Sequence, residues 1–239
     1  MPQAGGHYHT VAVNTLARHS DKWSFSLQAG DADSGDSIKS VSIGVTGHRS
    51  ERLNLADLDL LRDRVRHVFR AIVDTTGAHL TVVSSLADGT DQIVAEEAVA
   101  AGYRLVCPLP YSVADFDHEF ANRADLVTFH RLILRADLVM ELGGSRETAK
   151  TREAAYVAAG AEMLSLSDVL LAIWDGQDAR GSGGTAEVIA GASENGTPVV
   201  WIAADTPHTI RIIDDNANPE TAISRAILNC PEQLMGHNP

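Results

Sequence analysis

Residues 168–189 read DVLLAIWDGQDARGSGGTAEVI, and this stretch decides the fold class. Its first seven residues are almost continuously apolar, which is typical of a strand that is buried on both faces. A Gly-rich loop follows, and an Ala-rich segment suited to a helix comes after the loop. A buried strand that leads through such a loop into a helix is typical of a parallel α/β sheet.

The rest of the chain repeats this alternation of strand and helix. Five more short runs are apolar and rich in β-branched residues, namely 40–45, 80–85, 103–109, 137–142 and 198–203. Segments with helical periodicity separate the runs, namely 55–73, 91–101, 121–136, 147–164 and 185–195. The sequence therefore predicts a Rossmann-like, doubly wound α/β fold, with a mainly parallel sheet of about six strands and helices on both faces.

Domain boundaries follow from where this pattern begins and ends. Residues 1–37 have little periodicity and end in small, acidic and Gly residues, so we expect a poorly structured extension. The Rossmann-like domain is expected to span residues 38–203. Residues 204–239 are expected to form an appendage with one short helix over 219–229.

Composition limits the classes of function. The chain of 239 residues has a formal net charge of −13 and a pI near 5.1, which argues against sequence-independent binding of nucleic acid. Cys107 and Cys230 are isolated and give neither a disulfide framework nor a metal site, and His7 and His9 lack a third ligand. We expect no membrane span, no secretion signal, no metal and no cofactor, and we expect a cytoplasmic protein.

Three loops that follow predicted strands carry the candidate ligand-binding residues. In a parallel sheet these loops open onto the same edge, where ligands bind near the switch in strand order. The loop at 46–50 offers Gly47, His48 and Arg49. The loop at 84–92 offers Ser84, Ser85, Asp88, Gly89 and Asp91. The loop at 174–187 offers Trp174, Asp175, Gly176, Arg180, Gly181, Gly183, Gly184 and Thr185.

The last of these loops has the most specific chemistry. Glycines let the backbone approach an anion closely, and free amides at a helix N-terminus attract negative charge. Thr185 can add a hydroxyl donor or cap the helix. The pattern indicates a phosphate-binding turn, and the alternative is an ordinary flexible turn before a capped helix.

The other loops can complete a ligand site. Arg49 can bind phosphate with two hydrogen bonds, unless it pairs with a carboxylate. The hydroxyls and carboxylates of 84–92 can hold a ribose, although helix capping also explains Asp91. Trp174 and Tyr111 follow strands and can stack on a base, or they can be part of the core.

Several known signatures are missing. The stretch GVTGHR lacks the glycine spacing of GxGxxG, and GSGGT lacks the Lys of a Walker A loop. No GxSxG elbow is present either. These absences argue against a dinucleotide-dependent dehydrogenase, a P-loop ATPase and an α/β-hydrolase.

Taken in order, five stretches resemble the SLOG superfamily, named for its Smf/DprA and LOG members. They are IGVTGHR (43–49), VVSSLADGTDQIVAEEA (82–98), YRLVCPLPY (103–111), AGAEMLSLSDVLLAIWDG (159–176) and RGSGGTAEVI (180–189). The resemblance covers about residues 38–203 and implies a Rossmann-like fold with a nucleotide-ligand pocket. It also implies that Gly47, His48 and Arg49 match the first ligand loop, and that Gly183, Gly184 and Thr185 match the phosphate-binding turn.

The resemblance leaves more than one activity open. Some SLOG members sense nucleotide-derived signals in bacterial conflict systems, whereas LOG members cleave the base from a nucleoside monophosphate. Glu187 falls close to an acidic position that LOG enzymes use. The LOG pattern PGGxGTxxE is altered here, because Glu187 stands two residues beyond Thr185 instead of three and no proline precedes the turn.

Three hypotheses follow. The first is a sensor or binding domain for a nucleotide or nucleotide-derived phosphate. The second is a LOG-like phosphoribohydrolase, in which Glu187 stabilises an oxocarbenium-like sugar and Arg49 or Arg180 holds the phosphate. The third is a single-stranded nucleic-acid binder, which the acidic composition disfavours. Homo-oligomerisation is an expectation from the family resemblance.

Overall fold

The computed structural model describes residues 40–53, 57–177, 184–207 and 209–213, with the backbone of 17–19 and 22–24. The strands are β1 (Ala17–His19), β2 (Lys22–Ser24), β3 (Ser40–Gly47), β4 (His79–Val83), β5 (Arg104–Leu109), β6 (Leu138–Glu141), β7 (Val169–Trp174), β8 (Val199–Ala203) and β9 (Ile210–Ile213). The helices are α1 (Leu58–Thr76), α2 (Thr90–Ala100), α3 (Val113–Phe116), α4 (Arg123–Ile133), α5 (Ala149–Ser165) and α6 (Thr185–Glu194), and two short 3₁₀ turns are η1 (Ser50–Arg52) and η3 (Asp117–Glu119).

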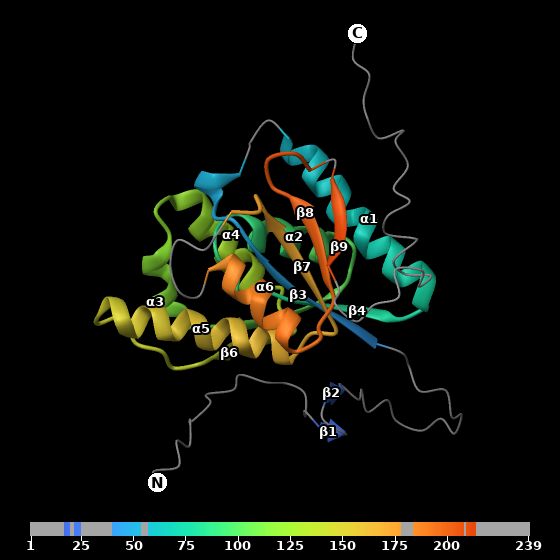
Figure 1. The fold of residues 1–239 in the computed structure, drawn as a ribbon. Helices are drawn as coiled ribbons and strands as arrows, with labels where there is room; N and C mark the ends of the chain where they lie inside the picture. The colour runs from blue at the N-terminus through green and yellow to red at the C-terminus, as the bar shows by residue number, and fades with distance from the viewer. Residues whose placement is uncertain are drawn as a thin grey trace.

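Within the described residues, seven strands form one sheet in the order β6-β5-β4-β3-β7-β8-β9 (Figure 1). Every neighbouring pair is parallel except β8 and β9. The predicted Rossmann-like α/β fold is therefore confirmed, and all six predicted strands are present.

Helices cover both faces of this sheet and give it three layers. Helix α2 contacts both α1 and α4, and the three helices pack on the larger core cluster, which includes Val65, Phe69 and Val94. Helices α5 and α6 contact each other on the other face, over a second cluster that includes Met163 and Ile189. Both faces of the central strands are apolar because both are covered.

The helix ends are set by local signals in the sequence. Helix α1 ends at Gly77, whose φ of 64° favours glycine. Helix α4 begins after Asn122, which accepts a hydrogen bond from the Asp125 N–H. Helix α5 begins with a reciprocal capping box between Thr148 and Thr151. These signals place each helix within a few residues of its predicted range.

The strand order reverses between β3 and β7. From β3 the chain moves outward through β4, β5 and β6 to one edge, and α5 then carries it back to β7 on the other side of β3. In such a sheet the loops that leave the two strands diverge to opposite faces, and they open a crevice at the carboxyl edge. The loops after β3 and β7 contain the predicted ligand residues.

Strand β9 and helix α3 are among the elements that the sequence did not predict. Strand β9 pairs antiparallel with β8 and extends the sheet beyond residue 203, where we expected an appendage. The single turn α3 begins at Ser112, whose hydroxyl accepts from the Asp115 N–H. The expected helix over 219–229 and Cys230 lie outside the described residues. The extension before residue 38 contains a short antiparallel pair, β1 with β2, and its boundary stays a prediction.

Two residues considered in the sequence analysis, Cys107 and Tyr111, lie in the core. Cys107 is completely buried in β5, and burial raises the pKa of its thiol. Tyr111, a predicted stacking residue, is also fully buried and packs edge-on against Tyr156. Tyr111 is therefore a core residue. Across the part of the chain that the structure describes, no helix is both long and apolar enough for a membrane span.

Candidate functional site

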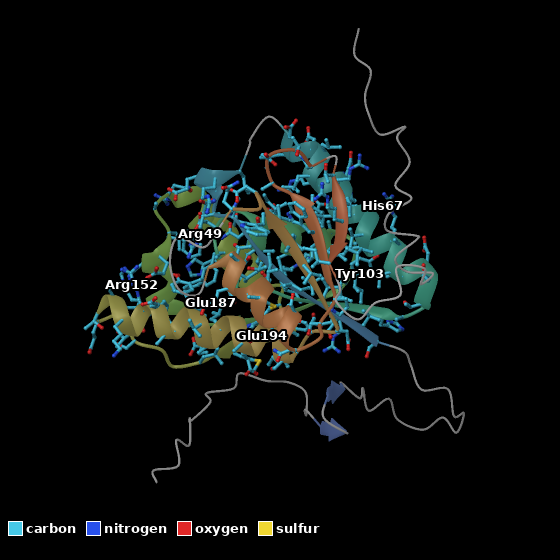
Figure 2. The ribbon with its side chains drawn as sticks, viewed as in Figure 1. Arg49, His67, Tyr103, Arg152, Glu187 and Glu194 are labelled. Atoms are coloured by element: carbon cyan, nitrogen blue, oxygen red, sulfur yellow. The ribbon has the colours of Figure 1, made fainter. Side chains whose placement is uncertain are left out.

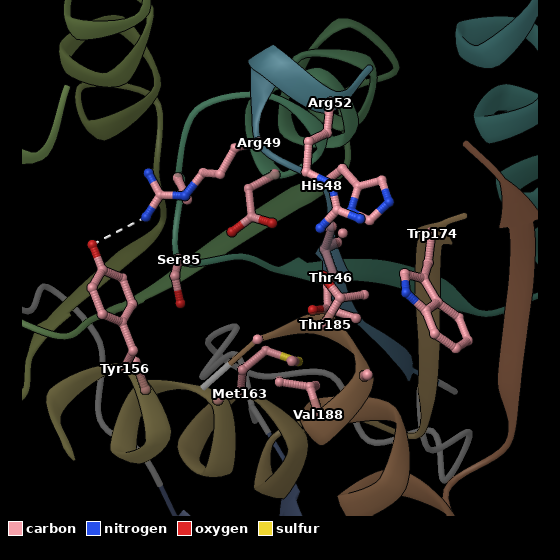
Figure 3. Close-up of a pocket in the computed structure, with 18 of the residues that line it drawn as sticks. Thr46, His48, Arg49, Arg52, Ser85, Tyr156, Met163, Trp174, Thr185 and Val188 are labelled. Carbon is pink, nitrogen blue, oxygen red and sulfur yellow. Dashed lines mark hydrogen bonds between the residues drawn. The ribbon is translucent and has the colours of Figure 1, made fainter. Parts of the chain in front are cut away.

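A cavity of about 410 Å³ opens at the carboxyl edge of the sheet, between the loops after β3 and β7 (Figure 3). Four segments that are distant in sequence line it, namely the end of β3 with η1, the loop before α2, one face of α5, and the end of β7 with the start of α6. The lining residues are Val45, Thr46, Gly47, His48, Arg49, Glu51, Arg52, Ser85, Ala87, Asp91, Tyr156, Ala159, Gly160, Met163, Trp174, Gln177, Gly184, Thr185, Ala186 and Val188.

Backbone hydrogen bonds hold the loop after β3 against its neighbours. The N–H of His48 donates to the carbonyl of Ile173 at 3.1 Å, and the N–H of Thr90 donates to the carbonyl of His48 at 3.0 Å. The loop is therefore joined to β7 on one side and to α2 on the other. Its conformation is fixed before any ligand arrives.

Two glycines are required where these backbones meet. A Cβ atom added to Gly47 would lie 2.5 Å from the carbonyl oxygen of Ile173 and 2.6 Å from Thr90. A Cβ atom added to Gly89, at a φ of 86°, would lie 2.5 Å from the backbone of His48 and Ser50. Close approach therefore explains Gly47, in place of the tight turn that the sequence suggested.

Arg49 is held on two sides. Its guanidinium pairs with the carboxylate of Asp88, and its Nη2 donates to the hydroxyl of Tyr156 at 3.1 Å (Figure 3). Burial opposes the charge, but Tyr156 and Asp88 outweigh burial and hold the pKa of Arg49 above its usual value. The guanidinium is thus a permanent positive charge at one end of the cavity.

The contacts of Tyr156 extend this arrangement away from the cavity. The Tyr156 hydroxyl donates to Glu119 at 3.0 Å, and Glu119 also accepts from Arg146 at 2.7 Å and from Arg152 at 2.9 Å. Burial opposes ionisation of Glu119, but Arg146 and Arg152 outweigh it and lower the pKa of this carboxyl. A continuous set of hydrogen bonds therefore orients Tyr156 toward Arg49.

A second cationic group lies at the opposite end of the cavity, beside Trp174 (Figure 3). Arg52 donates to Asp175 at 2.6 Å, and the backbone N–H of Asp175 donates to Nε2 of the buried His48 at 3.1 Å. Burial would raise the pKa of Asp175, but the Gln177 N–H and Arg52 outweigh burial and lower it. Asp175 therefore orients Arg52 and His48 at this end.

The start of α6 faces the same space. Gly184 is the N-cap residue, and no side chain caps the helix, so Thr185 occupies the first helical position and is not the cap. The first N–H groups of a helix have no partner within the helix, and the positive end of its dipole favours an anion. Gly184, Thr185 and Ala186 all line the cavity.

Asp91 lines the cavity from the first turn of α2, although it is only 8% exposed. It does not cap this helix, because Gly89 is the N-cap residue and no side-chain cap is formed. Burial raises the pKa of Asp91 to about 7, against the opposing effect of Arg49. A buried carboxyl with a raised pKa inside a cleft is typical of a functional position.

Sequence reasoning missed the residues that α5 contributes. Tyr156, Ala159, Gly160 and Met163 recur at helical spacing and present one face to the cavity. A Cβ atom added to Gly160 would lie 3.2 Å from Val188 of α6, so small residues let the two helices approach. Helical periodicity alone could have found this face, but only the strand order shows that it lies under the site.

The structure brings many of the predicted residues together around this cavity. Those that line it are Gly47, His48, Arg49, Ser85, Asp91, Trp174, Gly184 and Thr185. Those that lie outside the lining are Ser84, Asp88, Gly89, Asp175, Gly176 and Glu187. Arg180, Gly181 and Gly183 lie outside the described residues. Thr46, Arg52 and Gln177 line the cavity and were not predicted.

The predicted residues outside the lining have other roles. Ser84 is fully buried and accepts from the Leu86 N–H at 3.2 Å, so it shapes its own loop. Gly176 takes a φ of 80°, which favours glycine. Glu187 is exposed on α6, in the turn whose other residues face the cavity (Figure 2). Its catalytic role stays a prediction.

Comparison with known proteins supports the fold. No family model and no curated protein sequence matches the chain. DNA processing protein A from Streptococcus pneumoniae has a similar structure, with a TM-score of 0.50 and 15% identity over 82% of this chain and 56% of that protein. DNA processing protein A from Helicobacter pylori, described with a single-stranded DNA binding mode, gives a TM-score of 0.47 and 17% identity over 68% of this chain and 65% of that protein.

The chain therefore spans a little over half of the length of the Streptococcus pneumoniae protein. At this level of identity the similarity is one of fold. The chain has a Rossmann-like α/β fold similar to that of DNA processing protein A, and this is the fold class that the sequence predicted.

Proposed function

We propose that this chain binds a nucleotide or nucleotide-derived phosphate at the carboxyl edge of its sheet, as a sensor or ligand-binding domain. One observation carries the proposal. The N-terminus of α6 lies in the same cavity as Arg49 and Arg52, at the point where the strand order reverses. A helix N-terminus between two guanidinium groups suits an anion, and nucleotide phosphates bind at such positions in related folds.

The chemistry of the lining supports a phosphate better than a carboxylate or a neutral ligand. The hydroxyl of Thr185 and the amides of the first turn of α6 are donors for phosphate oxygens. Each guanidinium keeps its own carboxylate, Asp88 for Arg49 and Asp175 for Arg52, and each also has further N–H groups. The cavity volume of about 410 Å³ lies in the range of small-molecule sites.

The acidic character of the whole chain favours a small ligand. A net charge of −13 disfavours a polyanion, whereas the cations of this cavity act on a single phosphate within a few ångströms. The exposed position of Glu187 gives no support to base cleavage through that residue. Binding without hydrolysis is therefore the proposal.

A thermal-shift screen tests it directly. Inorganic phosphate, AMP, ADP-ribose, NAD and cyclic nucleotides are each added to the full chain, with a single-stranded oligonucleotide for comparison. A ligand at a hundred times its dissociation constant adds about 2.7 kcal/mol, which corresponds to a rise in Tm of roughly 5–10 °C for a domain of this size. Chromatography of the same samples detects any released base.

Matched arginine variants connect the shift to the cavity. Arg52→Gln removes a charge from the lining, and Arg104→Gln removes one at the start of β5, on the opposite edge of the sheet. We expect Arg52→Gln to reduce the ligand shift and Arg104→Gln to leave it unchanged. The absence of a shift with every phosphate compound, or equal losses in both variants, would overturn the proposal.

A further inference from the structure

Two hydrogen-bond acceptors face the cavity, one from the loop after β4 and one from the first turn of α2, and we propose that they bind the hydroxyl groups of a ribose. We call Asp91 and Ser85 together the acceptor wall. This inference rests on the proposed function and deepens it, because it names ribonucleotides as the ligand class. It also assigns the discrimination against deoxyribonucleotides to two named residues.

Asp91 supplies the first part of the acceptor wall. Its side chain lines the cavity, accepts hydrogen bonds from the Ala87 N–H and the Ser84 hydroxyl, and does not cap α2. The guanidinium of Arg49 donates its hydrogen bonds to Asp88 and Tyr156, and its charge opposes the rise in the pKa of Asp91. An ionised carboxylate has two oxygens and several lone pairs, so Asp91 retains capacity to accept hydrogen bonds from a ligand.

Ser85 supplies the second part. Its hydroxyl donates to the carbonyl of Pro108 at 2.9 Å, so its single proton is already used. The lone pairs of the same oxygen stay available, and Ser85 lines the cavity (Figure 3). Ser85 therefore presents an acceptor to the cavity, as Asp91 does.

The acceptor wall is unsuited to the phosphate itself. A carboxylate repels a phosphate, and its burial beside an anion site costs free energy unless it meets a donor. The charged and titratable groups that act on Asp91 are Arg49, Asp88 and the thiol of Cys107 in β5. Of these only Arg49 is a cation, and it already pairs with Asp88. A ligand that brings a neutral donor together with its anion therefore suits the remaining lone pairs of the acceptor wall.

A ribose meets this requirement. In a nucleotide the sugar is joined directly to the phosphate, and its two hydroxyls are neutral donors on adjacent carbons. Asp91 and the start of α6 line one cavity of about 410 Å³, so a sugar attached to a phosphate at α6 stays within the same enclosure as Asp91. An exocyclic amine of a base is the other neutral donor that a nucleotide carries, and the experiment distinguishes the two sources.

The experiment compares ligands that differ by one group, by calorimetry on the full chain at pH 8.5, where Asp91 is ionised. AMP is compared with 2′-deoxy-AMP and 3′-deoxy-AMP, each of which lacks one hydroxyl, and with IMP, which lacks the exocyclic amine. Inorganic phosphate is measured as the common anion. Loss of a hydrogen bond to a charged acceptor should weaken binding about tenfold to a hundredfold.

Two variants of similar charge test the assignment to Asp91. Asp91→Asn and Glu51→Gln each remove one negative charge from the lining of the cavity, so both should bind inorganic phosphate at least as tightly as the unmodified chain. Only Asp91→Asn should lose the preference for AMP over the deoxynucleotides. Ser85→Ala should reduce the preference for one of the two hydroxyls, and it provides a second readout if Asp91→Asn fails to fold.

The outcomes separate this inference from the proposed function. Equal affinity of the unmodified chain for AMP and both deoxynucleotides, with phosphate binding intact, overturns the acceptor wall and leaves the proposed function standing. A loss of affinity for IMP alone overturns the ribose assignment in favour of the base amine. Retention of the ribose preference in Asp91→Asn overturns the role of Asp91. If no phosphate compound binds, the proposed function and this inference both fail.

Discussion

The guanidinium of Arg49 donates to the hydroxyl of Tyr156 at 3.1 Å, across 107 residues of sequence. This contact joins the loop after β3 to the crossover helix α5. Because Glu119 also binds Tyr156, with Arg146 and Arg152 on the same carboxylate, Arg49 is oriented from a set of side chains that never reach the cavity. The orientation of the cation therefore depends on residues far from the ligand.

Tyr156→Phe should weaken the binding of inorganic phosphate about threefold to tenfold, with little change in Tm. The phenylalanine keeps the ring and removes the hydrogen bonds with Arg49 and Glu119, and such a bond contributes about 1 kcal/mol. Calorimetric titration measures the change. Tyr103→Phe is the matched control, because the Tyr103 ring packs edge-on against Phe69 and does not line the cavity. Equal effects of the two substitutions would contradict the role given to Tyr156.

Gly47→Ala should lower the free energy of unfolding by about 1–3 kcal/mol, because the new methyl group must displace backbone atoms of Ile173 or the side chain of Thr90. Urea denaturation followed by circular dichroism gives the value. Gly191→Ala provides the comparison, since its added Cβ would meet Leu164 at an ordinary 3.4 Å and alanine favours the helix interior. A neutral Gly47→Ala would show that the close approach is relaxed in solution.

The stability difference between Asp91→Asn and the unmodified chain should increase with pH. Burial raises the pKa of Asp91 from 3.8 to about 7, so the folded state binds this proton more tightly than the unfolded state does. The contribution is fully present below about pH 4 and is lost as the pH rises to about 7, by roughly 2–4 kcal/mol. Asp91→Asn should therefore be the more stable form at pH 8. Denaturation at pH 4, 6 and 8 measures the trend.

Asp175→Asn should show the opposite dependence. The pKa of Asp175 is lowered in the folded state, so its contribution to stability is present above its ordinary pKa and is lost as the pH falls below that value. The variant should be less stable than the unmodified chain at pH 8, and the difference should shrink toward pH 3. Parallel trends for Asp91→Asn and Asp175→Asn would contradict both assignments.

Glu187→Gln should leave the affinity for AMP within about twofold, since Glu187 is exposed and lies outside the lining of the cavity. The dissociation constants of the two forms give the comparison, together with the amount of free base after long incubation. A loss of base release in this variant would revive the phosphoribohydrolase hypothesis. The matched carboxylate within the lining is Asp91, whose substitution should change the ligand preference.

Much of the site could be predicted because its strands are strongly apolar and its loops directly follow them. Parallel strands bring loops at 46–50 and 174–187 to one edge whatever lies between them in sequence, and Gly47, Arg49 and Thr185 line one cavity there. The contribution of α5 was not predictable in the same way, because which helix crosses beneath the site depends on the strand order.

Other differences between the predicted and the observed structure also have local causes in the sequence. Strand β9 is a run of four residues with one exposed charge, Arg211, so it carries almost no periodic signal. Thr90 and Asp91 look like capping residues in the sequence, but the N-cap residue of α2 is Gly89, whose φ of 86° favours glycine, and the helix begins at Thr90. That shift leaves Asp91 available to the cavity. Arg52 was overlooked because a single turn, η1, turns it back toward the site.

Four stretches of the chain between Val45 and Val188 line the cavity. A fragment that ends between those positions therefore lacks part of the ligand site. Ligand affinity therefore reports whether the entire α/β body has formed. Any compound that binds in this cavity stabilises the protein against global unfolding. A fragment that lacks one of the four stretches is not stabilised by the same compound, even where its own helices are formed.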